Sequence, residues 1–416
     1  MTAPTVSVIV VSRDRPGPLA RLMRALRQLD YPAFEVIVAA DAPGRAAVRA
    51  AGLEECVKLV AVDAPGIGAA RNAGLAAAAG GIAAFIDDDA IPEPTWLTHL
   101  AGALADGPAV AAGGFVRGAN GISWQWRARS IDITLRHRLL AAPGEAPFHP
   151  VPGTGRAIRT EGTNMAFRRA ALLAIGGFDA AFRYYLDETD LNMRLARAGQ
   201  VTAIVPRAEV HHAMAASAQR GPDRAPRSLF EIGASVAIFL RKHTPPPWHA
   251  AALTTARGEA RRGLLRHLVA GGLEPRDIAA LMESFEDGLR AGRTRETALT
   301  PAVGPAPPFL PFPGAPGQPH RLLAGRPWQA RCLRRAAARL AAEGPVTLFL
   351  FDHTARAHRL RYRDTGVWEQ SGGLWGRAVR DRPAPWVRSF AARVEAETHR
   401  LAPVRRLRAV KAVDPC

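Results

Sequence analysis

Short apolar runs alternate with helix-like segments through the first 115 residues of the chain. The runs are rich in β-branched residues, whereas leucines recur at helical spacing between the first two runs, at Leu19, Leu22, Leu26 and Leu29. The pattern predicts strands at 6–11, 34–39, 58–62, 82–86 and 109–115, and helices at 69–79 and 94–104. Apolar strands that alternate with helices indicate an α/β fold, in which a parallel sheet is covered by helices on both faces.

Beyond residue 120 the pattern is less regular. A Trp- and Arg-rich stretch at 124–140 is predicted to be a helix, and a Gly/Pro-rich loop follows at 143–165. Residues 191–198 and 250–295 also show helical patterns. Residues 301–319 contain eight prolines and three glycines, a composition typical of a linker.

The C-terminal part of the chain shows a separate order of helix, strand, hairpin and helix. The strand is predicted at 346–351, and the hairpin at 358–363 and 367–370 with a turn at Asp364–Gly366. We therefore expect four parts along the chain: an α/β domain at 1–245, a helical extension at 246–300, a Pro/Gly-rich linker at 301–320 and a small basic α+β domain at 321–416.

The composition excludes a disordered chain, because 48% of the 416 residues are hydrophobic. The formal net charge is +18, and nearly all of the positive charge is arginine, since lysine occurs only three times. Residues 321–416 hold 20 Lys/Arg and 8 Asp/Glu, a net charge of +12. A basic surface favours anionic partners, such as nucleotides or anionic lipid.

The N-terminus lacks the basic start of a signal peptide, and its apolar run is too short for one. No stretch approaches the roughly 18 apolar residues that a membrane helix needs. The three cysteines lie far apart and match no metal-binding spacing. We expect a cytoplasmic protein, and the charge of 321–416 suggests peripheral contact with the inner face of the membrane.

Acidic residues follow the predicted strands. Asp41 and Asp63 each come just after an apolar run, and Asp87, Asp88 and Asp89 end the run at 82–86. Parallel sheets bind their ligands beyond the carboxyl ends of the strands. Clustered carboxylates suit Mg²⁺ or Mn²⁺, and the first and third acids of an extended stretch point to the same side. The alternative is a solvated acidic turn that caps the next helix.

Several short motifs together resemble the family 2 inverting glycosyltransferases, which have the GT-A nucleotide-diphospho-sugar transferase fold. The resemblance covers residues 4 to 220, about half of the chain. Its motifs are Val6–Ser12, Gly68-Ala-Ala-Arg-Asn-Ala-Gly74, Phe85-Ile-Asp-Asp-Asp89 with Pro92, Pro94 and Trp96-Leu97, Gly162-Thr-Asn164, Gly176-Gly-Phe-Asp179, Asp187-Glu-Thr-Asp-Leu191 with Arg194, and His211-His212.

The resemblance implies a divalent metal, Mg²⁺ or Mn²⁺, on the diphosphate of a nucleotide-sugar donor. Asp89 would hold the metal, and Asp87 would lie near the ribose and share in metal binding. One of His211 and His212 would be a further metal ligand, and the sequence leaves open which one. The alternative is a pair of structural or surface histidines.

The same resemblance implies further contacts to the donor. Arg71 and Asn72 would help to place the nucleotide, Asp41 would contact the base, and Asp88 would belong to the donor site. Asn164 would line the donor diphosphate or the acceptor mouth. The alternatives are a helix start with a solvated arginine for the pair and an ordinary loop for Asn164.

Inverting transfer also needs a general base to take the proton of the acceptor hydroxyl. The family's acid cluster matches Asp187 and Glu188, in swapped order, and the resemblance favours Glu188 as the base with Asp187 second. Acids in the first turn of a helix also stabilise the helix dipole, which is the alternative role. For Asp190, capping or an ion pair with Arg194 is as good an explanation as catalysis.

The sequence therefore predicts a metal-dependent hexosyltransferase that moves a sugar from a nucleotide-diphosphate donor to a hydroxyl acceptor. A UDP-sugar is favoured as the donor, and the acceptor is a glycan, a polysaccharide or a lipid-linked sugar. One alternative is a nucleotidyltransferase that makes nucleotide sugars. Another is a non-catalytic protein that binds nucleic acid or other anions, although the first domain lacks interleaved aromatic and basic residues, so no nucleic-acid partner is expected.

Overall fold

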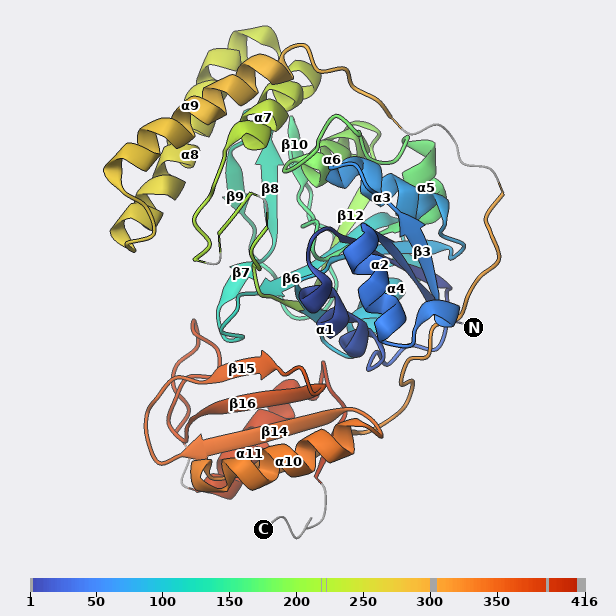
Figure 1. Cartoon of the computed structure of the whole chain (residues 1–416), viewed down its shortest axis with the longest axis vertical. Coiled ribbons are helices and arrows are strands. Elements are labelled where there is room, and N and C mark those ends of the chain that lie inside the picture. The colour runs from blue at the N-terminus through green and yellow to red at the C-terminus, as the bar shows by residue number, and fades with distance from the viewer. Residues whose placement is uncertain (1–2, 218, 222, 300–304, 387–388, 410–416) are drawn as a thin grey trace.

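The computed structural model describes residues 3–217, 219–221, 223–299, 305–386 and 389–409. A large central sheet carries helices on both faces, a helical region lies at one end, and a smaller sheet lies at the other end (Figure 1). The predicted α/β class, with its helical extension and small C-terminal unit, is confirmed.

The central sheet has nine strands, of which eight form a continuous path in the order β3-β2-β1-β4-β11-β6-β12-β5, while β7 pairs with β6. Strands β1 to β4 are parallel to one another, whereas β11 runs antiparallel between β4 and β6. The strands are β1 (Val6–Ser12), β2 (Phe34–Ala40), β3 (Val57–Ala61), β4 (Ile82–Asp87), β5 (Ala90–Pro92), β6 (Ala109–Arg117), β7 (Trp124–Trp126), β11 (Met165–Arg168) and β12 (Val201–His212).

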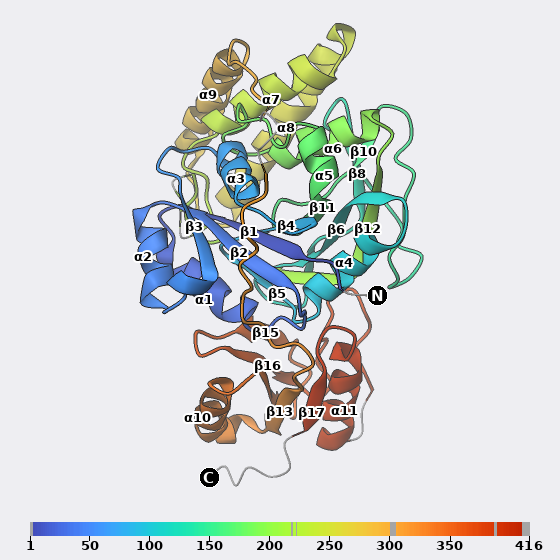
Figure 2. The same ribbon diagram turned by 90° about the vertical axis from the view of Figure 1, so that its right-hand side faces the viewer.

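Both faces of this sheet are apolar because alternate residues of each buried strand pack against helices on opposite sides. On β1, Val8 packs toward α1, α2 and α4, whereas Ile9 packs toward α3, α5 and α6 (Figure 2). The helices are α1 (Pro16–Leu26), α2 (Ala42–Ala50), α3 (Ile67–Ala76), α4 (Trp96–Ala105), α5 (Arg169–Ala174) and α6 (Asp187–Arg197). The five strands predicted in the first 115 residues are confirmed.

The helix predicted at 124–140 is wrong. The segment forms β7, which pairs with the edge of β6, and then β8 (Arg129–Asp132) and β9 (His137–Leu139). With β10 (Arg156–Ile158), the last two make a three-stranded sheet in the order β10-β8-β9. The alternation of Trp124, Gln125 and Trp126 suits a strand, whose side chains point to opposite faces in turn. The segment therefore forms strands because β7 pairs with the end of β6, and β8 pairs with β9 and β10.

The helical region consists of α7 (Phe230–His243), α8 (His249–Val269) and α9 (Pro275–Gly292). It confirms the helical pattern predicted at 250–295. Helices α7 and α9 approach closely at glycines, since a Cβ on Gly288 would lie 1.9 Å from the carbonyl oxygen of Phe230. Short 3-10 turns also occur at Glu54–Cys56, Pro246–Trp248 and Pro327–Gln329.

The described part of the proline-rich segment, 305–319, runs along the edge of the first strands toward the C-terminal sheet (Figure 2). The ring of Phe312 lies 5.5 Å from that of Phe34, and the Leu310 amide donates to the buried carboxylate of Glu35 at 3.0 Å. The segment is therefore fixed to the first domain by specific contacts. Residues 300–304, within the predicted linker, lie outside the described part of the chain.

The C-terminal sheet has the order β15-β16-β14-β13-β17, and only β15 is antiparallel to its neighbour. The unit is thus a mainly parallel α/β sheet and not the predicted α+β domain. The predicted hairpin is confirmed as β15 and β16, whereas β13 begins within the residues assigned to the linker. Its elements are β13 (His320–Gly325), α10 (Ala330–Ala341), β14 (Val346–Asp352), β15 (Arg359–Tyr362), β16 (Val367–Gly373), α11 (Phe390–Leu401) and β17 (Leu407–Ala409).

The domain boundaries remain predictions. Among the helices of the described ranges, none combines the length and the apolar character needed to cross a bilayer.

Candidate functional site

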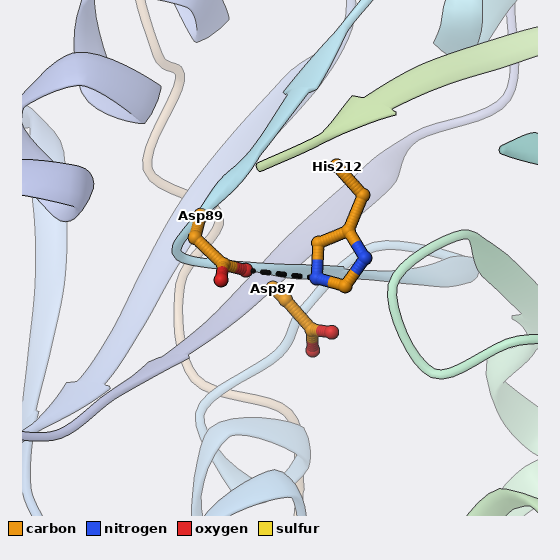
Figure 3. A group of neighbouring side chains, drawn as sticks. All are labelled: Asp87, Asp89 and His212. Carbon is orange, nitrogen blue, oxygen red and sulfur yellow. Dashed lines mark ion pairs between the residues drawn. The ribbon is translucent and has the colours of Figure 1, made fainter. Parts of the chain in front are cut away.

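Asp87, Asp89 and His212 converge at the carboxyl end of β4 (Figure 3). Asp87 is the last residue of β4, and Asp89 lies in the turn that leads into β5. Strand β5 pairs antiparallel with the end of β12, which places His212 opposite Ala90. As a result, one ligand atom from each of the three side chains lies within 4.8 Å of the other two.

Asp89 is held in place by the backbone that follows β12. The amide of Ala215 donates to Asp89 Oδ2 at 2.6 Å, and the amide of Ala213 donates to the Asp89 carbonyl at 3.0 Å. Burial alone would raise the pKa of Asp89, but His212, the charge of Arg15 and the Ala215 amide outweigh burial and hold it below its usual range. Asp89 is therefore ionised at neutral pH.

The ring of His212 is oriented by Gln125. His212 Nδ1 lies 3.2 Å from Gln125 Oε1, an acceptor, so the tautomer with its proton on Nδ1 makes this hydrogen bond and directs Nε2 at the aspartates. His212 Nε2 lies 3.1 Å from Asp89 Oδ1. An imidazole whose other nitrogen is held by a hydrogen bond is the arrangement usual for a metal-binding histidine.

His211 belongs to a different group. Because side chains alternate along a strand, His211 points to the opposite side of β12 from His212. Its Nε2 lies 2.8 Å from Glu93 Oε1, and Glu209 is the third member of that group. Of the two histidines between which the sequence left the choice open, His212 lies with the aspartates and His211 does not.

Asp88 uses its carboxylate within the protein. Ser12 Oγ donates to Asp88 Oδ2 at 2.7 Å, and Arg15 Nη1 donates to Oδ1 at 2.9 Å. Burial and the like charge of Asp89 raise the pKa of Asp88 to about 7, against the opposing effect of Arg15. Arg15 Nη1 also lies 3.3 Å from Asp89 Oδ2, so one guanidinium balances two adjacent carboxylates.

The position of Arg15 gives a prediction. In Arg15→Gln, we expect Mn²⁺ without nucleotide to bind roughly tenfold more tightly, because a positive charge next to the site opposes a second cation. Calorimetric titration with Mn²⁺ measures this, and Arg13→Gln in the same loop is the control, since Arg13 is more exposed and bonds to the carbonyl of Asp63. Weaker Mn²⁺ binding in Arg15→Gln would contradict the prediction.

The three residues of the convergent group have the donor chemistry of a divalent metal site. Two carboxylates and an imidazole suit Mn²⁺, Mg²⁺ or a similar ion. Asp89 Oδ1 is buried and accepts no hydrogen bond of good geometry from the described residues. An orphaned carboxylate oxygen that faces an oriented imidazole nitrogen fits a bound cation.

Arg71 connects this group to a second acidic pair. Its Nη2 lies 3.3 Å from Asp87 Oδ1, its Nη1 donates to Asp187 Oδ2, and its Nη2 also donates to the carbonyl of Gly162 at 3.1 Å. A Cβ on Gly162 would lie 2.4 Å from Arg71 Nη2, so only glycine leaves room for the guanidinium. Arg71 thus lies between Asp87 and Asp187, and its predicted role in placing the nucleotide stays a prediction.

Asp187 and Glu188 begin α6, after Tyr185 and Leu186 in the left-handed conformation. Glu188 Oε1 accepts from Arg159 Nη2 at 2.9 Å. Burial and the like charge of Glu188 raise the pKa of Asp187 to about 7, although Arg71 opposes this. Burial also acts on Glu188, but Arg159 and Arg71 outweigh it and lower its pKa.

The two acids differ in accessibility and in partners. The side chain of Glu188 is 9% exposed and that of Asp187 is 3% exposed, and Asp187 is bonded to Arg71. Asp190, the third acid of the cluster, pairs with Arg194 at 2.9 Å and contacts Lys242 and His243. The ion pair predicted for Asp190 is confirmed, and the geometry gives it a structural role.

Two predicted donor residues, Asn72 and Asp41, have their polar atoms engaged by the protein. Both ends of the Asn72 amide bond to the backbone of Phe178, at 2.7 and 2.9 Å. Asp41 caps α2 through the amide of Gly44 and also accepts from the amide of Asp14. Asp41 therefore shapes the loop after β1, and Asn72 fixes the start of the segment that leads to α6.

The prediction for Asn164 is wrong. The residue is fully buried, its Oδ1 accepts from Trp96 Nε1 at 2.8 Å, and its Nδ2 donates to the carbonyls of Phe115 and Ala208 at 3.0 and 2.8 Å. It joins α4, β6 and β12 and leaves no atom for a ligand. The sequence motif was a loop pattern, and it did not reveal that its last residue enters the core.

This role for Asn164 predicts a loss of stability. Asn164→Ala leaves three buried groups without partners, each of which costs about 1–3 kcal/mol, so we expect the free energy of unfolding to fall by about 3 kcal/mol or more. Urea denaturation measures it, with Gln200→Ala at an exposed position as the control. If Asn164→Ala kept the wild-type free energy of unfolding but lost nucleotide binding, Asn164 would contact the donor as the sequence predicted.

Three residues near the site escaped prediction. Arg15 lies in the short loop between β1 and α1, Gln125 lies in the segment predicted to be a helix, and Arg159 lies in the loop predicted at 143–165. Their contacts join residues that are distant in sequence, and no local pattern signals them. The alternation around Gln125 was the one available signal, and it would have predicted a strand.

Comparison with known proteins gives a family match for the first part of the chain. Residues 7–174 match the model described as glycosyl transferase family 2. Two curated relatives, the N-acetylglucosaminyl-diphospho-decaprenol L-rhamnosyltransferases of Mycobacterium tuberculosis strains CDC 1551 / Oshkosh and ATCC 25618 / H37Rv, are each 30% identical over 195 residues, which is 42% of this chain. The match spans 62% of the length of these relatives.

Two solved structures that match the chain are of low identity, with TM-scores below 0.5. A mannosyltransferase (PcManGT) from Pyrobaculum calidifontis, in complex with GDP-Man and Mn²⁺, is 19% identical with a TM-score of 0.44, over 70% of this chain and 88% of that one. Residues 1–349 of S. aureus TarS are 13% identical with a TM-score of 0.40, over 74% of this chain and 99% of that one.

Proposed function

We propose that this chain, whose residues 7–174 match the glycosyl transferase family 2 model, transfers a sugar from a nucleoside-diphosphate donor to a hydroxyl acceptor with inversion at the anomeric carbon. One observation carries the proposal. Arg71 links the group formed by Asp87, Asp89 and His212 directly to the acid pair Asp187 and Glu188. A cation-binding group and a buried acid pair thus share one guanidinium.

Asp87, Asp89 and His212 would hold a divalent ion, Mn²⁺ or Mg²⁺. When bound, such an ion would supply positive charge that stabilises the departing diphosphate. Gln125 keeps His212 Nε2 directed at the aspartates, and the Ala215 amide fixes Asp89. Arg15 and Arg71 add positive charge beside these aspartates, and Asp88 positions Arg15.

Glu188 would act as the general base. Its carboxylate takes the proton of the acceptor hydroxyl while that oxygen bonds to the anomeric carbon, and the bond from this carbon to the diphosphate oxygen breaks. Arg159 fixes Glu188 Oε1 and keeps the carboxylate ionised. Asp187 holds Arg71 between the two parts of the site, so it is a positioning residue.

The acceptor would be a lipid-linked sugar or another glycan. This part of the proposal is supported by the two curated relatives, whose names describe transfer to a decaprenol-linked sugar. A UDP-sugar is the first donor to test. A cytoplasmic location with peripheral contact to anionic lipid through the basic residues 321–416 is also a proposal, and liposome sedimentation with and without anionic lipid tests it.

The function is tested by incubating the purified chain with UDP-, GDP- and TDP-sugars, with and without Mn²⁺, and measuring release of the nucleoside diphosphate. We expect release from one donor class, dependent on the metal and accelerated by a lipid-linked or glycan acceptor. No release from any donor under any metal condition would overturn the proposed activity.

A further inference from the structure

The ribbon formed by β5 and the end of β12 has two faces with different partners. His212 lies on one face, toward Asp87 and Asp89. Its neighbour His211 and the paired Ile91 lie on the other face, where they meet the C-terminal sheet. The family match ends at residue 174, so it does not include the residues that cover this second face.

Four buried side chains join the C-terminal sheet to this face. Arg405 donates two hydrogen bonds to the carboxylate of Glu93, at 2.6 and 2.7 Å, and Glu93 also contacts His211 Nε2 at 2.8 Å. The ring of Trp368 lies 5.0 Å from that of His211, and the Arg405 guanidinium lies 3.9 Å from the ring of Trp368. Arg405, Glu93 and Trp368 are each at most 1% exposed.

Glu93 and His211 are close to the proposed metal ligands in the sequence. Glu93 follows Asp89 by four residues along β5, and His211 precedes His212 directly. A shift of His211 moves the backbone that carries His212, because adjacent residues of one strand share it. Since Arg405 and Glu93 neutralise each other in a buried place, removal of one charge leaves the other uncompensated.

The same C-terminal sheet also supports the segment that carries Gln125. The amide of Leu360 donates to the carbonyl of Asn120 at 3.0 Å, and the amide of Arg380 donates to the carbonyl of Ile122 at 2.9 Å. These contacts fix the connection from β6 to β7, and β7 carries Gln125, which orients the His212 ring. Two separate routes therefore lead from the C-terminal sheet to one imidazole.

We propose that Arg405 and Trp368 are positioning residues for His212, so that the C-terminal sheet is a fixed brace of the metal site. This role differs from that of a separate glycan- or membrane-binding module. The proposal rests on the proposed function for the role of His212 in metal binding. The coupling between the C-terminal sheet and the ribbon can be measured without the metal.

The experiment compares wild type, Arg405→Met and Trp368→Leu in two measurements. Hydrogen exchange at the amides of Ala213 and Ala215, which bond to Asp89, reports the order of the ribbon without metal. Calorimetric titration with Mn²⁺, with and without UDP, reports metal affinity. The control is Arg21→Gln, which breaks an exposed ion pair with Asp364 across the same interface and leaves the contacts among Arg405, Glu93, Trp368 and His211 in place.

We expect faster exchange at both amides and a 10- to 100-fold weaker affinity for Mn²⁺ in Arg405→Met and Trp368→Leu, the range typical when a group that orients a metal ligand is removed. Arg21→Gln should leave both measurements at wild-type values. If Arg405→Met does not fold, the double variant Glu93→Gln with Arg405→Met removes both buried charges and serves in its place.

If the amides of Ala213 and Ala215 exchange at wild-type rates in the Arg405 and Trp368 variants, the C-terminal sheet does not order the ribbon, and the proposal is wrong. Unchanged affinity for Mn²⁺ in variants with faster exchange would overturn the positioning of His212. If the wild-type chain binds no Mn²⁺ with or without nucleotide, the metal site of the proposed function is wrong, and so is the role of Arg405 and Trp368 in positioning a metal ligand. The hydrogen-exchange data still decide whether the C-terminal sheet orders the ribbon.

Discussion

Asp89→Ala is expected to abolish Mn²⁺-dependent binding of a nucleoside diphosphate and to lower sugar transfer by about 10³-fold or more. Asp89 is the one acid of the group that contacts His212 and is also fixed by backbone amides. A metal ion contributes several kcal/mol to stabilising charge in a transition state, and each 1.36 kcal/mol is a factor of ten in rate. Titration with UDP and Mn²⁺ and a transfer assay measure the two effects.

The matched control for this variant is Asp63→Ala. Asp63 also follows a strand of the sheet, β3, but its side chain is 76% exposed and lies outside the convergent group. We expect this control to keep both metal-dependent binding and activity. If Asp89→Ala bound UDP and Mn²⁺ as tightly as wild type, the assignment of the metal site would be wrong.

Glu188→Gln is expected to lower kcat by about 10²- to 10⁴-fold with little change in KM for the donor, because general base catalysis contributes about that much to rate. Glutamine keeps the size of the side chain and its contact with Arg159 but cannot accept the proton. Steady-state kinetics with donor and acceptor measure both constants. A variant with wild-type kcat would exclude Glu188 as the base.

The pH dependence separates Glu188 from Asp187. Burial and the like charge of Glu188 raise the pKa of Asp187 to about 7, so below this pH Asp187 takes up a proton and loses its ion pair with Arg71, while Glu188, whose pKa is lowered, stays ionised. We therefore expect kcat/KM to rise with pH up to about 7 and then to level off. Asp187→Asn removes the neighbouring charge from Glu188, which lowers the pKa of Glu188 and shifts the rise to lower pH. A profile in Asp187→Asn identical to wild type would contradict the coupling.

Much of the fold could be predicted because its strands are continuous apolar runs. The runs at 6–11 and 82–86 are buried on both faces of the sheet, and a parallel sheet requires that pattern. The position of Asp87 and Asp89 followed from the same rule, since ligands lie at the carboxyl ends of such strands. The apolar pattern of the strands and the rule for ligand position in parallel sheets gave the same prediction, and the structure brings Asp87 and Asp89 together.

The parts that could not be predicted depend on how elements pair and pack with one another. The segment 124–140 forms strands because β7 pairs with the end of β6 and β8 pairs with β9 and β10, and these partners are not visible in its Trp- and Arg-rich composition. The separation of His211 from His212 depends on how β12 pairs with β5. Asn164 matches a loop motif, yet its amide is taken by three groups from other elements.

The role of the C-terminal part also could not be predicted from its sequence alone. Its positive charge suggested an anion-binding surface, but Arg405 and Trp368 lie in the interface with the first domain. An arginine that pairs with Glu93 across 312 positions of sequence leaves no trace in local composition. Charge counts predict partners in solution only where the charged side chains are exposed.

The most direct test of the metal site is pulsed electron–nuclear double resonance of Mn²⁺ bound to the ¹⁵N-histidine-labelled chain with UDP. We expect one ¹⁵N coupling from a histidine and ³¹P couplings from the diphosphate in the same spectrum, with the ¹⁵N coupling lost in His212→Gln and retained in His211→Gln. A spectrum of fully hydrated Mn²⁺ that does not change with nucleotide would contradict the account.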